Sequence, residues 1–299
     1  MGDGRLTWKR TYEIEVPPAA AMSWQDYERL ILAQWSDVLE SAPTPTELAV
    51  HRFLEQHPSI VPGAFNIIGG SSGHFPWLGA LISRPPLPSY DRRIPDFMWL
   101  SLNSEIEEPV LIEIEAPGKR WFTASGTQTA HLTQALGQIA GWKAWLGVPR
   151  NVEAFKAFYK LDREAWQRRR FRPAYLLIYG RRAEASATPS LTQKRSYLHA
   201  DDVVSMTFDR LRPNPSASQT VCVKADATGS FKAISVPPTL KWSPSLAQDR
   251  SLIQDLPAAI EANPNIESER KEFLIRRLAY WNEWATREQR GIINSGDEE

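Results

Sequence analysis

Apolar positions in the first quarter of the chain recur at helical spacing. They predict one helix over residues 23–40 and a second that begins near Pro45, because proline suits the first turn of a helix. The second helix is expected to end at His57, since a residue before proline is pushed out of helical geometry. Residues 62–92 are rich in Gly, Pro and Ser and are expected to be mostly loop.

The middle of the chain changes to strand patterning. Residues 97–102 and 110–115 predict two strands joined by a polar turn, after which Pro117-Gly118 breaks the chain. Residues 129–146 then carry the clearest helical stripe of apolar side chains. A strand pair followed by a long helix is therefore expected at the centre of the fold.

The rest of the chain alternates further helices and strands. Helices are expected over 151–169, 250–261 and 266–287. Strands are expected over 175–179, 203–208, 220–224 and 231–236, with a linker at 213–218. This order of elements predicts an α/β fold.

Composition excludes several classes of protein. The single Cys222 allows no intramolecular disulfide and no thiol-based metal site, and it favours a reducing compartment. The first ten residues lack the apolar segment of a signal peptide, and no run approaches the ~18 apolar residues of a membrane span. A cytoplasmic protein without a membrane partner is expected. The 35 basic and 35 acidic residues balance, so nucleic-acid binding needs a local basic patch.

Three carboxylates lie at the predicted strand pair. Side chains alternate along a strand, so Glu113 and Glu115 project from the same side, roughly 7 Å apart at their Cα atoms. Asp96 immediately precedes the first strand. Like charges this close are costly to bury without a cation, and Mg²⁺ takes one or two carboxylates plus waters and phosphate. The pattern alone leaves a second interpretation open, in which the glutamates line the solvated face of an edge strand and Asp96 belongs to a turn.

These residues, with their neighbours, resemble the nuclease domain of Shedu-type anti-phage defence proteins, within the PD-(D/E)XK nuclease superfamily. The resemblance spans about residues 44–212. It rests on short motifs in a fixed order: Glu47-Leu48, 53–58 (FLEQHP), 94–97 (IPDF), 113–120 (EIEAPGKR), 134–139 (QALGQI), 178–182 (IYGRR) and 207–211 (TFDRL).

The resemblance implies a restriction-endonuclease-like core, a mixed central sheet flanked by helices, at 44–212. Small helical additions are expected at 1–43 and at 213–299, where strands accompany the helices. It also implies metal-dependent hydrolysis of DNA phosphodiesters in defence against foreign DNA, with Mg²⁺ or Mn²⁺ and no organic cofactor. Asp96 and Glu113 would bind the metal, with Glu115 as a further ligand or base. Glu47 matches a helical acid that completes the metal shell in this superfamily, although a surface carboxylate is an equal alternative.

The chain departs from the superfamily at one position. The superfamily's lysine normally stands two residues after the second acid, where this chain has Glu115. Lys119, beyond the Pro117-Gly118 turn, is the best replacement, because its long side chain could return over the site. The competing interpretation is an exposed lysine without contacts. A rival function is therefore a catalytically weak or inactive DNA-binding or sensor module that retains the nuclease fold.

Further candidates come from the long helix and from a basic segment. Gln138 matches the superfamily's helical glutamine, which points at the metal site or a DNA phosphate; a partly exposed polar edge is the alternative. Arginines on both sides of the 175–179 strand are candidate phosphate ligands, since the guanidinium suits phosphate, although a solvated charged face is equally consistent. The DNA-binding candidates are Arg120, Arg168, Arg169, Arg170, Arg181 and Arg182.

The final predicted helix bears on assembly. Residues 266–287 carry an apolar stripe that includes Phe273, Leu278 and Trp281, and such a stripe must pack either on the nuclease core or on another copy. The stripe and the family resemblance together lead us to expect a homo-oligomer.

Overall fold

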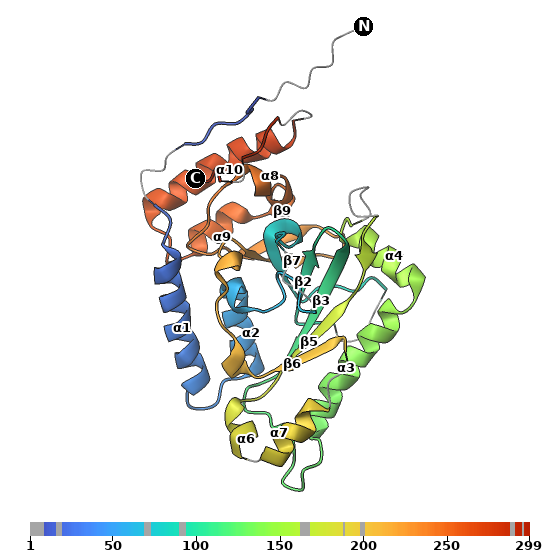
Figure 1. Ribbon diagram of the computed structural model, residues 1–299. Helices are drawn as coiled ribbons and strands as arrows, with labels where there is room; N and C mark the ends of the chain where they lie inside the picture. The colour runs from blue at the N-terminus through green and yellow to red at the C-terminus, as the bar shows by residue number, and fades with distance from the viewer. Residues whose placement is uncertain are drawn as a thin grey trace.

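One mixed β-sheet organises the molecule (Figure 1). The structure is a computed structural model that describes residues 9–15, 20–68, 73–89, 94–161, 168–187, 189–197, 201–287, 291–294 and 296–299. Within these residues the sheet has nine strands, in the order β6-β5-β3-β2-β1-β7-β8-β9, with the short β4 pairing β3. The strands are β1 (Ala80–Ser83), β2 (Phe97–Leu102), β3 (Ile106–Ile114), β4 (Arg170–Phe171), β5 (Ala174–Ile178), β6 (Val203–Met206), β7 (Val221–Ala225), β8 (Phe231–Ser235) and β9 (Ile253–Gln254).

Helices cover both faces of the sheet and one of its ends. The helices are α1 (Trp24–Glu40), α2 (Glu47–Gln56), α3 (Ala130–Leu146), α4 (Pro149–Phe158), α6 (Arg182–Ala187), α7 (Pro189–Ser196), α8 (Pro244–Arg250), α9 (Leu256–Ala262) and α10 (Ser268–Ala285). In Figure 1, α1 and α2 lie on one side of the sheet and α3 and α4 on the other. Helices α6 and α7 lie at the lower end, and α8 to α10 lie at the upper left. This arrangement fits a restriction-endonuclease-like α/β fold, so the predicted fold class is confirmed.

Alternation along the central strands divides the core into two layers. Val110, Ile112 and Ile114 of β3 pack with α1 and α2 in one cluster. Leu111 of the same strand packs with α3 in the other cluster. Residues at odd positions of β3 therefore face α3, and Glu113 belongs to this set.

The sequence prediction placed most elements, with three corrections. The described part of 62–92 is mostly loop, as expected, but it also contains β1, which pairs β2 on one side and β7 on the other and which the sequence did not predict. Within the helix expected over 151–169, α4 ends at Phe158, and Lys160 takes the left-handed conformation. Residues 162–167 lie outside the described residues, and 170–171 form β4. The helix expected over 250–261 begins only at Leu256, as α9, because α8 ends at Arg250, β9 follows, and Asp255 takes the left-handed conformation.

Residues beyond 212 continue the same sheet. Strand β7 pairs β1 in parallel along Ala80–Ser83, and β8 and β9 follow. The segment 9–15 packs against the C-terminal elements: the ring of Tyr12 lies 5.8 Å from that of Trp281, and Arg277 donates to Glu13 O at 2.7 Å. The apolar stripe of α10 is buried within the chain, with Phe273 only 2% exposed. The stripe therefore does not require a second copy, and the expected homo-oligomer stays a prediction.

Candidate active site

The two strand glutamates are buried at the centre of the sheet. Strand β3 lies between β2 and β5, and Glu113 and Glu115 are 0% and 1% exposed. The alternative interpretation, a solvated face on an edge strand, is therefore wrong. Glu113 lies within the strand, whereas Glu115 follows it, and the Glu115 N–H donates to Ile178 O of β5 at 3.2 Å.

Asp96 is fixed beside Glu113 through the backbone of β3. The Asp96 N–H donates to Ile112 O at 3.0 Å, and Asp96 Oδ2 accepts from the Ile114 N–H at 2.9 Å. These two partners are the residues immediately before and after Glu113. The structure thus brings together two acids, Asp96 and Glu113, that lie seventeen positions apart in the sequence.

Lys119 returns over the end of β3. Its Nζ donates to Glu115 Oε2 and lies 3.8 Å from Glu47 Oε2, at the first turn of α2. The return depends on a tight turn, in which the Lys119 N–H donates to Ala116 O at 3.0 Å. A Cβ at Gly118 would lie 2.9 Å from the Thr44 methyl carbon, so the turn packs closely against the chain that leads into α2. The alternative of an exposed lysine without contacts is therefore wrong, because Lys119 joins two acids from different elements.

Gln138 lies on α3 and makes no hydrogen bond to the acids within the described structure. It is half-buried, and both polar atoms of its amide are covered. Among the described residues neither atom has a hydrogen-bond partner, so no bond joins Gln138 to Asp96 or Glu113. A covered amide with unmet hydrogen bonds is unusual in a folded protein and counts against a merely solvated polar edge.

Two residues at this end of the sheet were missed by the sequence reasoning. Tyr179 directly follows β5, and its hydroxyl donates to Arg120 O at 3.1 Å. Burial raises the pKa of Tyr179, and the charge of Glu115 adds to the rise. Glu184 of α6 accepts from the Trp121 N–H at 3.0 Å and so fixes the chain that follows Lys119. The position of Tyr179 could have been predicted from the sequence. Strands β3 and β5 are parallel, so the residues that directly follow them lie at the same end of the sheet.

The predicted DNA-binding arginines fall into two groups at opposite ends of the sheet. Arg170 pairs Ile106 at the start of β3, with Arg168 and Arg169 just before it. Arg120, Arg181 and Arg182 follow the ends of β3 and β5, near the buried acids.

Members of the second group differ in their contacts. The Arg181 guanidinium is hydrogen-bonded within the protein. It donates to Asp209 at 3.0 Å, to Glu40 at 2.7 Å and to Leu39 O at 2.7 Å. The Arg120 side chain is 67% exposed and lies 3.8 Å from Glu184. The surface beside the acids therefore offers fewer arginines than the sequence clustering indicated.

The donor set is suited to a hard cation. Asp96, Glu113, Glu115 and Glu47 supply only carboxylate oxygens, the ligands that Mg²⁺ prefers. Over the described part of the chain, no group of three or more His, Cys, Asp or Glu side chains is arranged to hold a metal ion. Mg²⁺ needs only one or two protein carboxylates beside water and phosphate, and the residue chemistry of Asp96 and Glu113 is compatible with such a pair.

Comparison with known proteins identifies the family. A family model described as Shedu protein SduA, C-terminal, matches residues 45–211, more than half of the chain. The chain belongs to the Shedu SduA family. A search of curated proteins found no match. The Shedu match covers every acid of the candidate site as well as Lys119 and Gln138, and membership supports a role in anti-phage defence.

No helix among the described residues is long and apolar enough to cross a lipid bilayer.

Proposed function

We propose that this Shedu family member is a metal-dependent DNA nuclease of the PD-(D/E)XK type. The observation that carries the proposal is the fixed pairing of Asp96 with the two residues that flank Glu113. Glu113 is fully buried in the central sheet, where an ionised carboxylate is costly to keep without a cation.

Each residue of the candidate site has a separate role in the proposed cleavage reaction. Asp96 and Glu113 hold Mg²⁺ or Mn²⁺, which when bound stabilises charge on the phosphoryl oxygens and lowers the pKa of an attacking water. Lys119 supplies a cationic donor to the phosphate, and Glu115 holds the lysine in place through their ion pair. Glu47 fixes the lysine from the α2 side, 3.8 Å away. Arg120 and Arg182, beside the site, contact the DNA backbone.

The rival function is a DNA-binding or sensor module without cleavage activity. The observation that favours it is the ion pair itself, because Lys119 between Glu115 and Glu47 is already neutralised by two acids. The two functions differ in one outcome, which is phosphodiester cleavage by the purified protein.

The test is a cleavage assay on linear and supercoiled DNA with Mg²⁺, with Mn²⁺ and with EDTA. Wild type is expected to cut only with metal. Asp96→Asn and Glu113→Gln are each expected to abolish cleavage without unfolding the protein, since each removes a metal ligand but keeps the side-chain volume. Asp37→Asn, an exposed acid of α1, is the matched control and should cut like wild type.

Full cleavage by a folded Asp96→Asn or Glu113→Gln variant would disprove the proposed metal pair. Metal-independent DNA binding with no cleavage by the wild type under any condition would favour the sensor module.

A further inference from the structure

A hairpin of two helices borders the acid end of the sheet, where β3 ends at Ile114 and Glu115 follows. Strands β3 and β5 are parallel and pair Ile114 with Ile178, so the residues that follow β5 start level with Glu115. Helix α6 begins at Arg182, four residues after β5, and α7 follows it. Both helices lie together at the lower end of the molecule in Figure 1. The hairpin is therefore placed beside the candidate site.

The hairpin is fixed to the chain that follows Lys119. Glu184 of α6 accepts from the Trp121 N–H at 3.0 Å. Lys194 of α7 donates to Gly126 O at 2.6 Å. These bonds join the hairpin and the chain after Lys119 into one unit, so a ligand that binds α7 has a fixed position relative to the acids.

Arg195 of α7 stacks on this unit. Its guanidinium lies 4.4 Å from the centre of the Trp121 ring. The ring is held in place, because its Nε1–H donates to Tyr179 O at 3.1 Å and a Cβ at Gly180 would lie 2.9 Å from Nε1. Within the described residues the Arg195 side chain has no hydrogen-bond acceptor and no ion pair. A stacked guanidinium can still donate in its own plane, so Arg195 is oriented to bind an anion.

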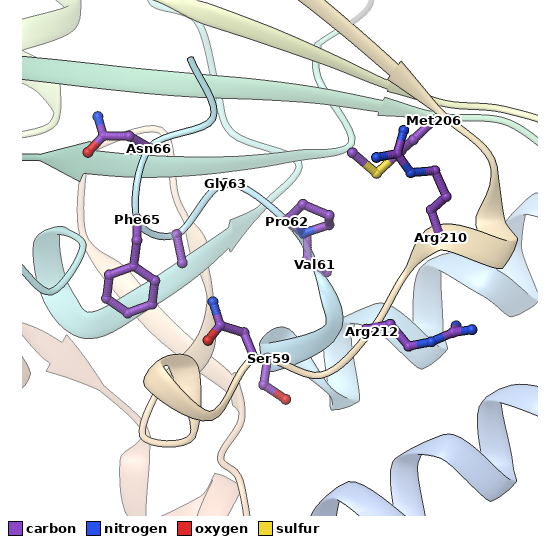
Figure 2. A pocket seen from close by; sticks show the side chains of 11 residues that line it. Ser59, Val61, Pro62, Gly63, Phe65, Asn66, Met206, Arg210 and Arg212 are labelled. Carbon is purple, nitrogen blue, oxygen red and sulfur yellow. The ribbon is translucent and has the colours of Figure 1, made fainter. Parts of the chain in front are cut away.

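A second arginine lies near Arg195. Arg210 ends a short 3-10 helix, whose first residue, Phe208, donates through its N–H to Gly180 O at 3.2 Å. Figure 2 shows the Arg210 side chain extended from this part of the chain, in a different direction from Arg212. The Arg210 side chain makes no hydrogen bond or ion pair with any residue that the structure describes. Burial lowers the pKa of Arg195 and the charge of Arg210 lowers it further, so the two positive charges are close enough to repel each other.

The surface around this pair has an excess of positive charge. Residues 185–200 contain no Asp or Glu, and the Glu184 carboxylate accepts two backbone N–H groups. Arg120 and Lys194 are exposed on the same unit. Two like charges that lie close together are unfavourable unless an opposite charge lies between them. An anion that bridges the two guanidinium groups would supply it.

We propose that Arg195 and Arg210 together bind one backbone phosphate of the DNA that lies across the acids. The strand to be cut has to pass the end of β3, and the two arginines lie at that end of the sheet. Arginine suits this role because its planar fork donates two hydrogen bonds to one phosphate. Phosphate contacts position DNA and carry no sequence information, so the pair sets the register of the strand over the acids. The inference rests on the proposed function, because it takes DNA as the ligand.

The experiment is fluorescence anisotropy of a short labelled DNA duplex with the full chain, in EDTA and at several salt concentrations. Arg195→Ala and Arg210→Ala should each weaken binding roughly 10- to 100-fold, the range for a lost hydrogen bond to a charged group. The double variant should lower the slope of log K against log salt by about 1, because one phosphate is involved, whereas two separate contacts would lower it by about 2. Arg195→Lys should keep the slope but lose affinity, since lysine keeps the charge without the fork.

Controls separate phosphate binding from folding and from general charge. Arg29→Ala, whose side chain in α1 is 78% exposed, should bind DNA like wild type. Thermal unfolding of Arg195→Ala shows whether loss of the contact with Trp121 unfolds the protein. Arg210→Ala removes no such contact, so it tests the pair even where Arg195→Ala is unstable.

Binding without metal separates this inference from the proposed nuclease. DNA binding that needs both arginines, in a protein that never cleaves, would support the phosphate site and disprove the nuclease. Cleavage with wild-type DNA affinity in a folded Arg195→Ala or Arg210→Ala variant would overturn the phosphate site alone. A slope that is unchanged in the double variant, or lowered by about 2, would overturn the shared phosphate. Tighter arginine-dependent binding of an RNA duplex would overturn DNA as the ligand.

Discussion

Replacing Lys119 by alanine should reduce both the stability and the activity of the protein. The Glu115 side chain is 2% exposed and that of Lys119 is 26% exposed. Removing one partner of a fully buried ion pair costs ~3–5 kcal/mol, whereas exposed pairs contribute ~0–1 kcal/mol. Because the lysine is a quarter exposed, we expect Lys119→Ala to lower the free energy of unfolding by about 2 kcal/mol. If Lys119 also stabilises the transition state, cleavage should fall by ~10²–10³.

A second substitution separates the two effects. Glu115→Gln in the Lys119→Ala protein removes the uncompensated buried charge, and should recover about 1 kcal/mol or more of the lost stability. It supplies no cation, so cleavage should stay low. Lys119→Arg should restore part of the cleavage, limited by the different shape of the guanidinium.

Urea denaturation and single-turnover cleavage with saturating Mg²⁺ measure the two quantities. Lys224→Ala, an exposed lysine of β7, is the matched control and should change neither. Cleavage by Lys119→Ala within about threefold of wild type would refute a catalytic role for the lysine. Unchanged stability in the same variant would refute the importance of the ion pair.

Three further predictions follow from other residues. Burial lowers the pKa of His57 from 6.5 to about 4. The contribution of the neutral imidazole to the free energy of unfolding is therefore full above about pH 6.5 and is lost as the pH falls toward 4, by up to about 3 kcal/mol. When unfolding is measured against pH, this loss should be smaller in His57→Asn. Arg172→Ala leaves the fully buried Glu108 without its cation and should lower the free energy of unfolding, measured in urea, by ~2–4 kcal/mol. The control Arg168→Ala, at an exposed position of the nearby turn, should lower it by less than about 0.5 kcal/mol. Light scattering at tens of micromolar should give a mass above that of one chain, and a strictly monomeric mass would contradict the expected homo-oligomer.

The sequence predicted those parts of the site that depend on local pattern. The strand over 97–102 was placed correctly because its apolar run is bounded by clear turn signals. The proximity of Asp96 to Glu113 followed from their positions on a short strand pair. Local pattern was sufficient in both cases because the residues concerned are close in the chain.

Other features depend on contacts between distant segments. Strand β1 has only four residues, in a segment rich in Gly and Pro, and it is a strand because β2 and β7 pair with it on both sides. The ion pair of Lys119 with Glu47 joins residues seventy-two positions apart. The predicted DNA-binding arginines lie at opposite ends of the sheet because β5 runs between the two parts of their sequence cluster. No periodicity within one segment could have predicted them.

The parallel pairing of β1 with β7 has a practical consequence for anyone who makes fragments of this protein. A fragment that stops at Arg212 omits β7 and leaves one side of β1 without its hydrogen-bonding partner. All four residues of β1 are buried in the intact chain, so the new edge would be apolar as well as unpaired. Such an edge is a template for pairing with other chains, and the truncated protein is expected to aggregate. A preparation limited to the family-matched residues would then appear inactive because it self-associates, whatever the chemistry of its acids.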